Sequence, residues 1–407
     1  MPQEILEERP IEREQGLTPP ERPPWCSPLS DRLLTILFVI FLLVPPVGWL
    51  LGWKGGAQLQ ENRNLAPAPI FSSDPVAAWP AKVEAYYDDH FGFRAGLVHF
   101  QSLLLHKYLK ASNADAVVGK DGWAFYAEER IFEDFWGKSP FSDDELKNWK
   151  MDLEKRQALL ARSGKGYLFV VAPDKPTIYP EMLPGYMSAR RGRSRFQQLT
   201  EYLKKSNSNA RILDLHEPLI QAKTMGLTYF PSDAHWNGRG FFVAYQEMCQ
   251  ALIPWVPGIR PQQLGSDYTI QAKPWSGGEW GLFGLPEENL KSHSEFLFPA
   301  GTQRARRGVA TLPAAVPAPA ESWLAPLYWE GPGEKSLLIF HDSFIRTGMW
   351  DTEQVPLAEH FKRTLLVGMQ PTDIQFQAMI DAFHPDVVIE ERAERFMRGP
   401  PAPKPGR

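Results

Sequence analysis

Short apolar runs that alternate with amphipathic helices most strongly limit what this chain can fold into. Strand-like runs recur in the last two thirds of the chain, at 166–173, 211–215, 336–340, 364–369 and 386–391. Runs that are apolar throughout are typical of strands buried on both faces, which occur in parallel sheets covered by helices. We therefore predict an α/β fold with a mostly parallel sheet and helices on both faces.

The helices between these runs carry their own start and stop signals. In the segment 142–164, Ser142 and Glu145 have the spacing of a capping box, and Gly164 is a typical helix terminator. A second amphipathic helix is expected over 373–384, between the last two strands. In such a fold, function sits where the parallel strands end at their carboxyl edge.

A separate apolar segment precedes this region. Residues 33–53 run for 21 residues without a charge, which is long enough to span a bilayer as a helix, although Pro45 and Pro46 should kink it or end it early. A cleaved signal peptide is the alternative, but no clear small-residue cleavage site follows. We predict an uncleaved membrane anchor.

The predicted domain organisation follows from these segments. From the N-terminus it comprises a disordered tail (1–32), a transmembrane anchor (33–53), a stem and lead-in (54–110), a domain that contains the predicted sheet (111–397) and a disordered tail (398–407). Residues 255–335 are rich in Pro, Gly and Ala, and few strong elements are expected there.

Composition argues against several classes of protein. The formal net charge of −4 gives no sign of nucleic-acid binding, which usually needs a basic face. The two cysteines, Cys26 and Cys249, cannot form a disulfide framework, and Cys249 is expected to be a buried free thiol. No histidines show metal-ligand spacing, so neither a metal nor a cofactor is predicted.

Two polar motifs carry candidate chemistry. A buried strand runs directly into "HDSF" at 341–344, where the hydroxyl of Ser343 would lie near free N–H groups at the start of a helix. The segment "SDAHWNGRG" at 232–240 supplies a base, His235, and a carboxylate, Asp233, that could orient it. Taken singly, each motif also has a simpler interpretation as a polar turn or a helix cap.

Several segments in this order resemble one known family. They are "ENRNLAPAP" (61–69), "YYDDHFGFR" (86–94), "VVGKDGWAFY" (117–126), "VVAPDKPTIYPEMLP" (170–184), "SDAHWNGRG" (232–240), "FHDSF" (340–344) and "PDVVIEERAER" (385–395). The pattern is similar to the SGNH-hydrolase-like acetyltransferases of bacterial exopolysaccharide systems, of the alginate O-acetyltransferase type. The resemblance implies a circularly permuted fold in which Asp233 and His235 precede Ser343. It also implies a nucleophilic Ser343, a general base and acid in His235, and an orienting Asp233. The family usually has Gly where this chain has His341.

The resemblance implies an O-acetyltransferase that moves acetyl through Ser343 onto hydroxyls of an exported polysaccharide. Its acetyl donor would be a multi-pass membrane acyltransferase. The catalytic domain would lie outside the inner membrane of a bacterium. Two alternatives stay open: an acetyl esterase that uses the same triad, and a non-enzymatic polysaccharide-binding subunit of a secretion complex.

Four further residues are candidate substrate contacts. Trp236 and Asn237 follow the base directly, and Arg346 lies one helical turn past Ser343. Lys175 follows a strand end, although it could equally form a structural ion pair with Asp174.

Overall fold

The computed structural model describes residues 28–52, 65–70, 72, 75–276, 278, 283, 291–317, 319, 324–347 and 355–397. The described residues up to Gly96 form one compact unit, and those from Leu97 onward form a second. The predicted C-terminal tail and residues 1–27 of the predicted N-terminal tail lie outside the described residues. Residues 28–32 were expected in that tail but belong to the first helix.

The first unit contains the long apolar helix α1 (Pro28–Leu50). Pro28 stands at its first position, where a missing N–H costs nothing, and Asp31 lies in the first turn, where a negative charge is favoured. The helix continues through Pro45 and Pro46, so of the two outcomes expected for these prolines an early end is wrong, and a kink stays a prediction. Among the described helices, α1 is long and apolar enough to cross a membrane, and a signal sequence would meet the same criteria.

Two shorter helices follow. In the first unit, α2 (Trp79–His90) packs its Tyr87 edge-on against Trp49 of α1, with ring centroids 6.5 Å apart. The boundary between the two units falls within α3 (Arg94–Ser102), which continues as a π-helical segment over Leu103–Tyr108.

A seven-stranded sheet forms the centre of the second unit. Its strand order is β4-β3-β11-β9-β10-β8-β7. The bounds in that order are Ile212–Asp214, Gly166–Ala172, Val387–Ala393, Ser336–His341, Arg363–Gly368, Leu327–Glu330 and Arg306–Gly308. The first five strands are mutually parallel, and β8 and β7 add antiparallel partners at one edge. The prediction of a mostly parallel sheet is confirmed, whereas β7 and β8 were not foreseen.

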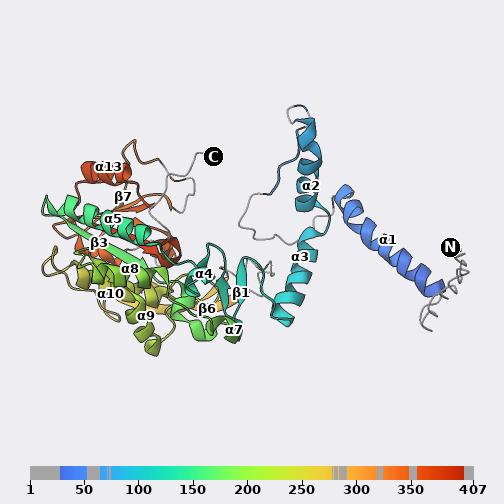
Figure 1. Cartoon of the computed structure of the whole chain (residues 1–407), viewed down its shortest axis with the longest axis horizontal. Helices are drawn as coiled ribbons and strands as arrows, with labels where there is room; N and C mark the ends of the chain where they lie inside the picture. Colours follow the sequence, from blue (N-terminus) through green and yellow to red (C-terminus); the bar gives the residue numbers. More distant parts are fainter. Residues whose placement is uncertain are drawn as a thin grey trace, which may run out of the picture. The chain divides into compact units, whose positions relative to one another are not determined.

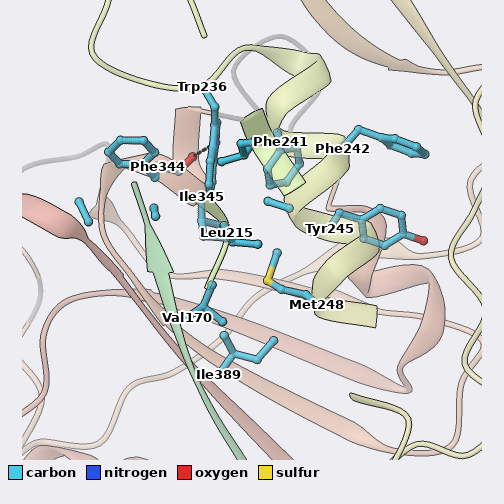
Figure 2. Packing of buried hydrophobic residues seen from close by; sticks show 14 of the residues in the cluster. Val170, Leu215, Trp236, Phe241, Phe242, Tyr245, Met248, Phe344, Ile345 and Ile389 are labelled. Carbon is cyan, nitrogen blue, oxygen red and sulfur yellow. Dashed lines mark hydrogen bonds between the residues drawn. The ribbon is translucent and has the colours of Figure 1, made fainter. Parts of the chain in front are cut away.

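Helices cover both faces of this sheet (Figure 1). One face packs against α5 (Asp143–Ala161), α8 (Arg195–Lys205) and α13 (Asp373–Phe383). The other packs against α9 (His216–Ala222), α10 (Gly238–Leu252) and α12 (Ser343–Thr347). Successive strand residues alternate between the two cores, as the pleat of a strand requires. Figure 2 shows the core between the sheet and helices α9, α10 and α12. There, Met248 of α10 lies near Val170 of β3 and Ile389 of β11.

Local signals in the sequence operate as expected. Ser142 and Glu145 form the capping box of α5, and Gly164 lies just beyond its end with a φ of 68°. Cys249 is a free thiol buried inside α10.

Smaller elements complete the second unit. Among them are α4 (Ile131–Phe135), α6 (Lys175–Ile178), α7 (Gly185–Ser188), the hairpin of β1 (Ala116–Val118) with β2 (Ala124–Tyr126), and the pair β5 (Tyr268–Ser276) with β6 (Lys291–Pro299). The expectation of few strong elements over 255–335 is wrong, because β5 and β6 pair along their whole length. Apolar and polar residues alternate from Tyr268 to Lys273, which is a period-two strand pattern, and Pro274 interrupts it before the strand ends.

Candidate active site

A tight loop ahead of α10 presents Asp233 and His235. Tyr229 and Trp236 form an isolated antiparallel bridge, and Phe230 N–H donates to the carbonyl of His235 at 3.1 Å, so residues 229–236 form a closed turn. Within it, Asp233 Oδ1 accepts from the main-chain N–H of His235 at 3.0 Å and lies 2.5 Å from His235 Nδ1. The turn therefore fixes the imidazole relative to the carboxylate.

Ser343, which lies 108 residues after His235 in the sequence, is the third residue of this site. Ser343 is the first residue of α12 and follows the carboxyl end of β9 after a single connecting residue. Its Oγ lies 2.7 Å from His235 Nε2. The structure thus brings Ser343, His235 and Asp233 into one hydrogen-bonded line at the carboxyl edge of the parallel strands, where function was expected.

His235 lies between Ser343 and Asp233, and the charge of Asp233 suits a proton acceptor at that place. Asp233 is 4% exposed, and burial alone would raise its pKa. The charge of His235 and the hydrogen bonds from it outweigh burial and hold the pKa of Asp233 below its ordinary value. In serine hydrolases, a carboxylate in such a position stabilises the imidazolium that forms when the histidine accepts a proton.

Lys175 supports the loop, and the prediction that it contacts substrate is wrong. Its side chain is 1% exposed, and Nζ donates to the main-chain carbonyls of Phe230 (3.1 Å), Pro231 (3.1 Å) and Asp233 (2.6 Å). The alternative ion pair with Asp174 is also not formed, because Asp174 pairs with Arg395 at 2.8 Å. A single buried ammonium group thus ties down the turn that carries Asp233.

Trp236 and Asn237 are also structural, which corrects their prediction as substrate contacts. Trp236 is fully buried, and its Nε1–H donates to the carbonyl of Phe344 at 2.8 Å, joining the histidine loop to the serine turn (Figure 2). Asn237 caps α10, since its Oδ1 accepts from the N–H groups of Arg239 (3.1 Å) and Gly240 (3.0 Å). Both side chains hold the segment that contains His235 and do not face the solvent.

Arg346 has a different environment. It is half-buried on α12, and within the described part of the chain its guanidinium has no hydrogen bond or ion pair. Burial, and then the charge of Arg307, lower the pKa of Arg346. A role in substrate contact therefore stays a prediction for this residue.

His341 replaces the usual glycine without backbone strain. It is the last residue of β9 and does not appear among the residues with positive φ. Its ring is buried, and its Nδ1 lies 2.7 Å from the carbonyl oxygen of Asp342. The position requires neither the conformational freedom nor the small size of glycine.

Asp342, foreseen as a possible helix cap, has that role. Its Oδ1 accepts the main-chain N–H of Phe344 at 2.9 Å. No group of three or more His, Cys, Asp or Glu side chains able to hold a metal ion occurs among the residues that the structure describes.

The fold and the geometry of the site define an SGNH-hydrolase-like α/β protein. Residues 116–318 match the family model described as the SGNH hydrolase-like domain of the acetyltransferase AlgX. The chain is a member of this SGNH-hydrolase-like O-acetyltransferase family. The matched segment includes Asp233 and His235 and ends before Ser343.

Curated relatives lie in the same family. The chain is 26% identical over 200 residues to the probable alginate O-acetylase AlgJ of Pseudomonas syringae pv. tomato, covering 49% of each chain. It is 27% identical over 195 residues to that of Pseudomonas aeruginosa, covering 47% of this chain and 46% of the relative. The chain thus matches about half the length of these relatives.

Two solved structures are among those that match this chain at low sequence identity. The O-acetyltransferase domain of Pseudomonas putida AlgJ matches with 16% identity and a TM-score of 0.43, covering 70% of this chain and 93% of that one. Bacillus cereus PatB1 matches with 15% identity and a TM-score of 0.46, covering 67% and 94% respectively.

Proposed function

We propose that this protein transfers an acetyl group, through an ester on Ser343, to hydroxyls of an exported bacterial polysaccharide. The observation that carries the proposal is the continuous contact from Ser343 Oγ to His235 Nε2 (2.7 Å) and from His235 Nδ1 to Asp233 (2.5 Å). Family membership supports acyl transfer as the reaction class.

In the first half-reaction, Ser343 Oγ attacks the acetyl carbonyl while its proton passes to His235 Nε2. Asp233 stabilises the imidazolium across the Nδ1 contact. Collapse of the tetrahedral intermediate breaks the bond to the donor's leaving group, which receives the proton from His235. Acetyl-Ser343 remains.

In the second half-reaction, a sugar hydroxyl attacks acetyl-Ser343 and gives its proton to the same nitrogen. The new ester leaves with the sugar, and Ser343 regains its proton. The negative oxygen of each intermediate needs N–H donors. The Phe344 N–H is already donated to Asp342, so the N–H of Ser343 itself is the donor that we propose from this turn.

We further propose that α1 is retained as a single-pass anchor in the bacterial inner membrane, with the second unit on the outer side. Its length and apolar character support this placement. Acetyl-coenzyme A is absent outside the cytoplasm, so we propose a multi-pass membrane acyltransferase as the partner that supplies acetyl.

The test uses the full chain, purified in detergent, with p-nitrophenyl acetate as donor and a panel of glycans as acceptors. Mass spectrometry should find an acetyl group first on Ser343 and then on glycan, and Ser343→Ala should form neither product. Rapid hydrolysis of acetyl-Ser343 with every glycan would favour the esterase. Absence of acetyl-Ser343 in the folded wild-type protein would contradict the proposal.

A further inference from the structure

The turn that carries Ser343 is attached to its neighbouring strand by side chains. β11 and β9 run parallel, and their register extends from Val387↔Leu337 to Glu390↔Phe340. Beyond that pair, the main-chain N–H of Asp342 donates to the side chain of Glu391, at 3.0 Å from Oε2. Glu391 thus continues the connection between the two strands where their main-chain pairing has stopped.

The side chain of Asp342 also accepts a hydrogen bond from β11. Its Oδ2 accepts the main-chain N–H of Ala393 at 2.6 Å, while its Oδ1 caps the first turn of α12 through Phe344. Two hydrogen bonds, one in each direction, therefore join the residue before Ser343 to the end of β11. We call the pair Glu391 and Asp342 the carboxyl clip.

The environment of the carboxyl clip determines the protonation of Glu391. The side chain is 1% exposed, and within the described part of the chain its Oε1 is buried without a hydrogen-bond partner. Burial, followed by the adjacent Asp342, raises the pKa of Glu391 well above its ordinary range, and Arg395 opposes the shift. A neutral carboxyl can lie against Asp342 without placing two negative charges side by side.

We propose that Glu391 is a positioning residue of this enzyme, which holds the turn so that Ser343 Oγ meets His235. It touches neither the reacting serine nor the imidazole and acts through Asp342. The inference rests on the proposed function, because positioning matters only if Ser343 is a nucleophile. Misplacing a reacting atom by about 1 Å can cost about 10²-fold in rate.

The adjacent residue provides a matched control. Glu390 lies on the same strand but points to the opposite face, where it accepts from Tyr167 Oη (2.9 Å), Arg156 and Arg392 (2.9 Å). It is as buried as Glu391, and the hydrogen bonds of its side chain go to Tyr167, Arg156 and Arg392 and not to the serine turn. Loss of either carboxyl should destabilise the protein, and only loss of Glu391 should change Ser343.

The experiment compares Glu391→Leu, Glu391→Gln and Glu390→Leu in the full chain. The measured quantity is the rate constant for acetylation of Ser343 by p-nitrophenyl acetate, per folded molecule. Glu391→Leu should lower it about 10²-fold. Glu391→Gln should stay within fivefold, since its amide oxygen can still accept from Asp342 N–H and its side chain keeps the size and shape of a neutral carboxyl. Should a leucine variant not fold, serine replaces leucine at that position.

Three results would overturn the inference. One is a Glu391→Leu protein within threefold of the wild type. The second is a Glu390→Leu protein that is as slow as Glu391→Leu, because both carboxyls would then act only on stability. The third is an equal loss in Glu391→Gln and Glu391→Leu.

A second reagent separates this inference from the proposed function. Phenylmethanesulfonyl fluoride reacts with an activated serine without any acetyl transfer. If wild-type Ser343 is sulfonylated but never acetylated, the transferase proposal fails, and the same variants decide the role of Glu391 from sulfonylation rates. If wild-type Ser343 reacts with neither reagent, both proposals fail.

Discussion

Replacing Asp233 by asparagine tests the proposed triad most directly. The substitution keeps the size and shape of a side chain that is 4% exposed. The amide oxygen can still accept the main-chain N–H of His235, and the three hydrogen bonds from Lys175 to the loop involve only carbonyls of the main chain. The change therefore removes a negative charge and leaves the turn in place.

The magnitude follows from the geometry. His235 Nδ1 lies 2.5 Å from Asp233 Oδ1, which places the centres of the two charges about 4 Å apart when the imidazolium forms. At an effective dielectric constant of about 20, such a pair interacts by about 4 kcal/mol, which corresponds to about 10³-fold in rate. The equivalent change in Ser-His-Asp proteases costs about 10⁴-fold. We expect Asp233→Asn to slow acetylation of Ser343 by about 10³- to 10⁴-fold.

A second Asp-x-His sequence in the same chain serves as the control. His216 N–H donates to Asp214 Oδ1 at 2.9 Å, and His216 Nδ1 lies 2.6 Å from the same oxygen. This local geometry reproduces that of Asp233 and His235. Asp214→Asn should therefore leave the rate of Ser343 acetylation within about twofold of the wild-type rate. That result would show that removing the charge of an Asp-x-His pair does not by itself slow the reaction.

The assay is single-turnover acetylation by p-nitrophenyl acetate, followed by intact mass and corrected for the folded fraction from circular dichroism. A loss of less than about tenfold in folded Asp233→Asn would refute the reasoning, because the Coulomb interaction estimated above would then be absent. In that case Asp233 would be a turn residue only.

Three further predictions concern Lys175, His216 and the apolar helix α1. Lys175→Met should lower the free energy of unfolding by about 3 kcal/mol in urea titrations, since three main-chain carbonyls lose a charged donor. An unchanged urea midpoint of unfolding would contradict the role of Lys175 in stabilising the loop. His216, whose pKa is raised to about 10 because Glu394 and Asp214 outweigh burial, should stabilise the fold fully below pH 6.5 and progressively less as pH rises through 10. The difference in unfolding free energy between wild type and His216→Gln should therefore shrink by a few kcal/mol from pH 7 to pH 10, and a constant difference would disprove it. A reporter active only outside the cytoplasm, fused after residue 407, should be active, with an intact mass that retains α1; a silent reporter would place the catalytic unit in the cytosol.

Much of the fold follows from local pattern. A strand buried on both faces of a sheet is usually rich in apolar residues, so the central parts of β3, β9 and β10 are visible as apolar runs. β11 is buried throughout as well, although it contains Glu390, Glu391 and Arg392. The capping box of α5 is similarly local, because its partners are three residues apart. Strands at the edge of the sheet, such as β7, carry no such signal, since β7 is exposed throughout.

The support of the site was not visible in the sequence. Trp236 and Asn237 stand next to His235, which made them plausible substrate contacts. Their burial depends on partners far along the chain or across the loop, such as the carbonyl of Phe344 for Trp236 Nε1. Glu391 was overlooked for the same reason, because its partner Asp342 lies 49 residues away.

The two Asp-x-His motifs separate what the sequence determines from what the tertiary structure decides. In each, a two-residue spacing suffices to place the carboxylate on the main-chain N–H and on Nδ1 of the following histidine. The partner of the other ring nitrogen is not a local property. Packing of the strands places Glu394 3.4 Å from His216 Nε2, where it holds the imidazole as a cation, and places Ser343 2.7 Å from His235 Nε2. Only the second histidine can take a proton from a serine, because only it meets one across the 108 residues that the fold brings together.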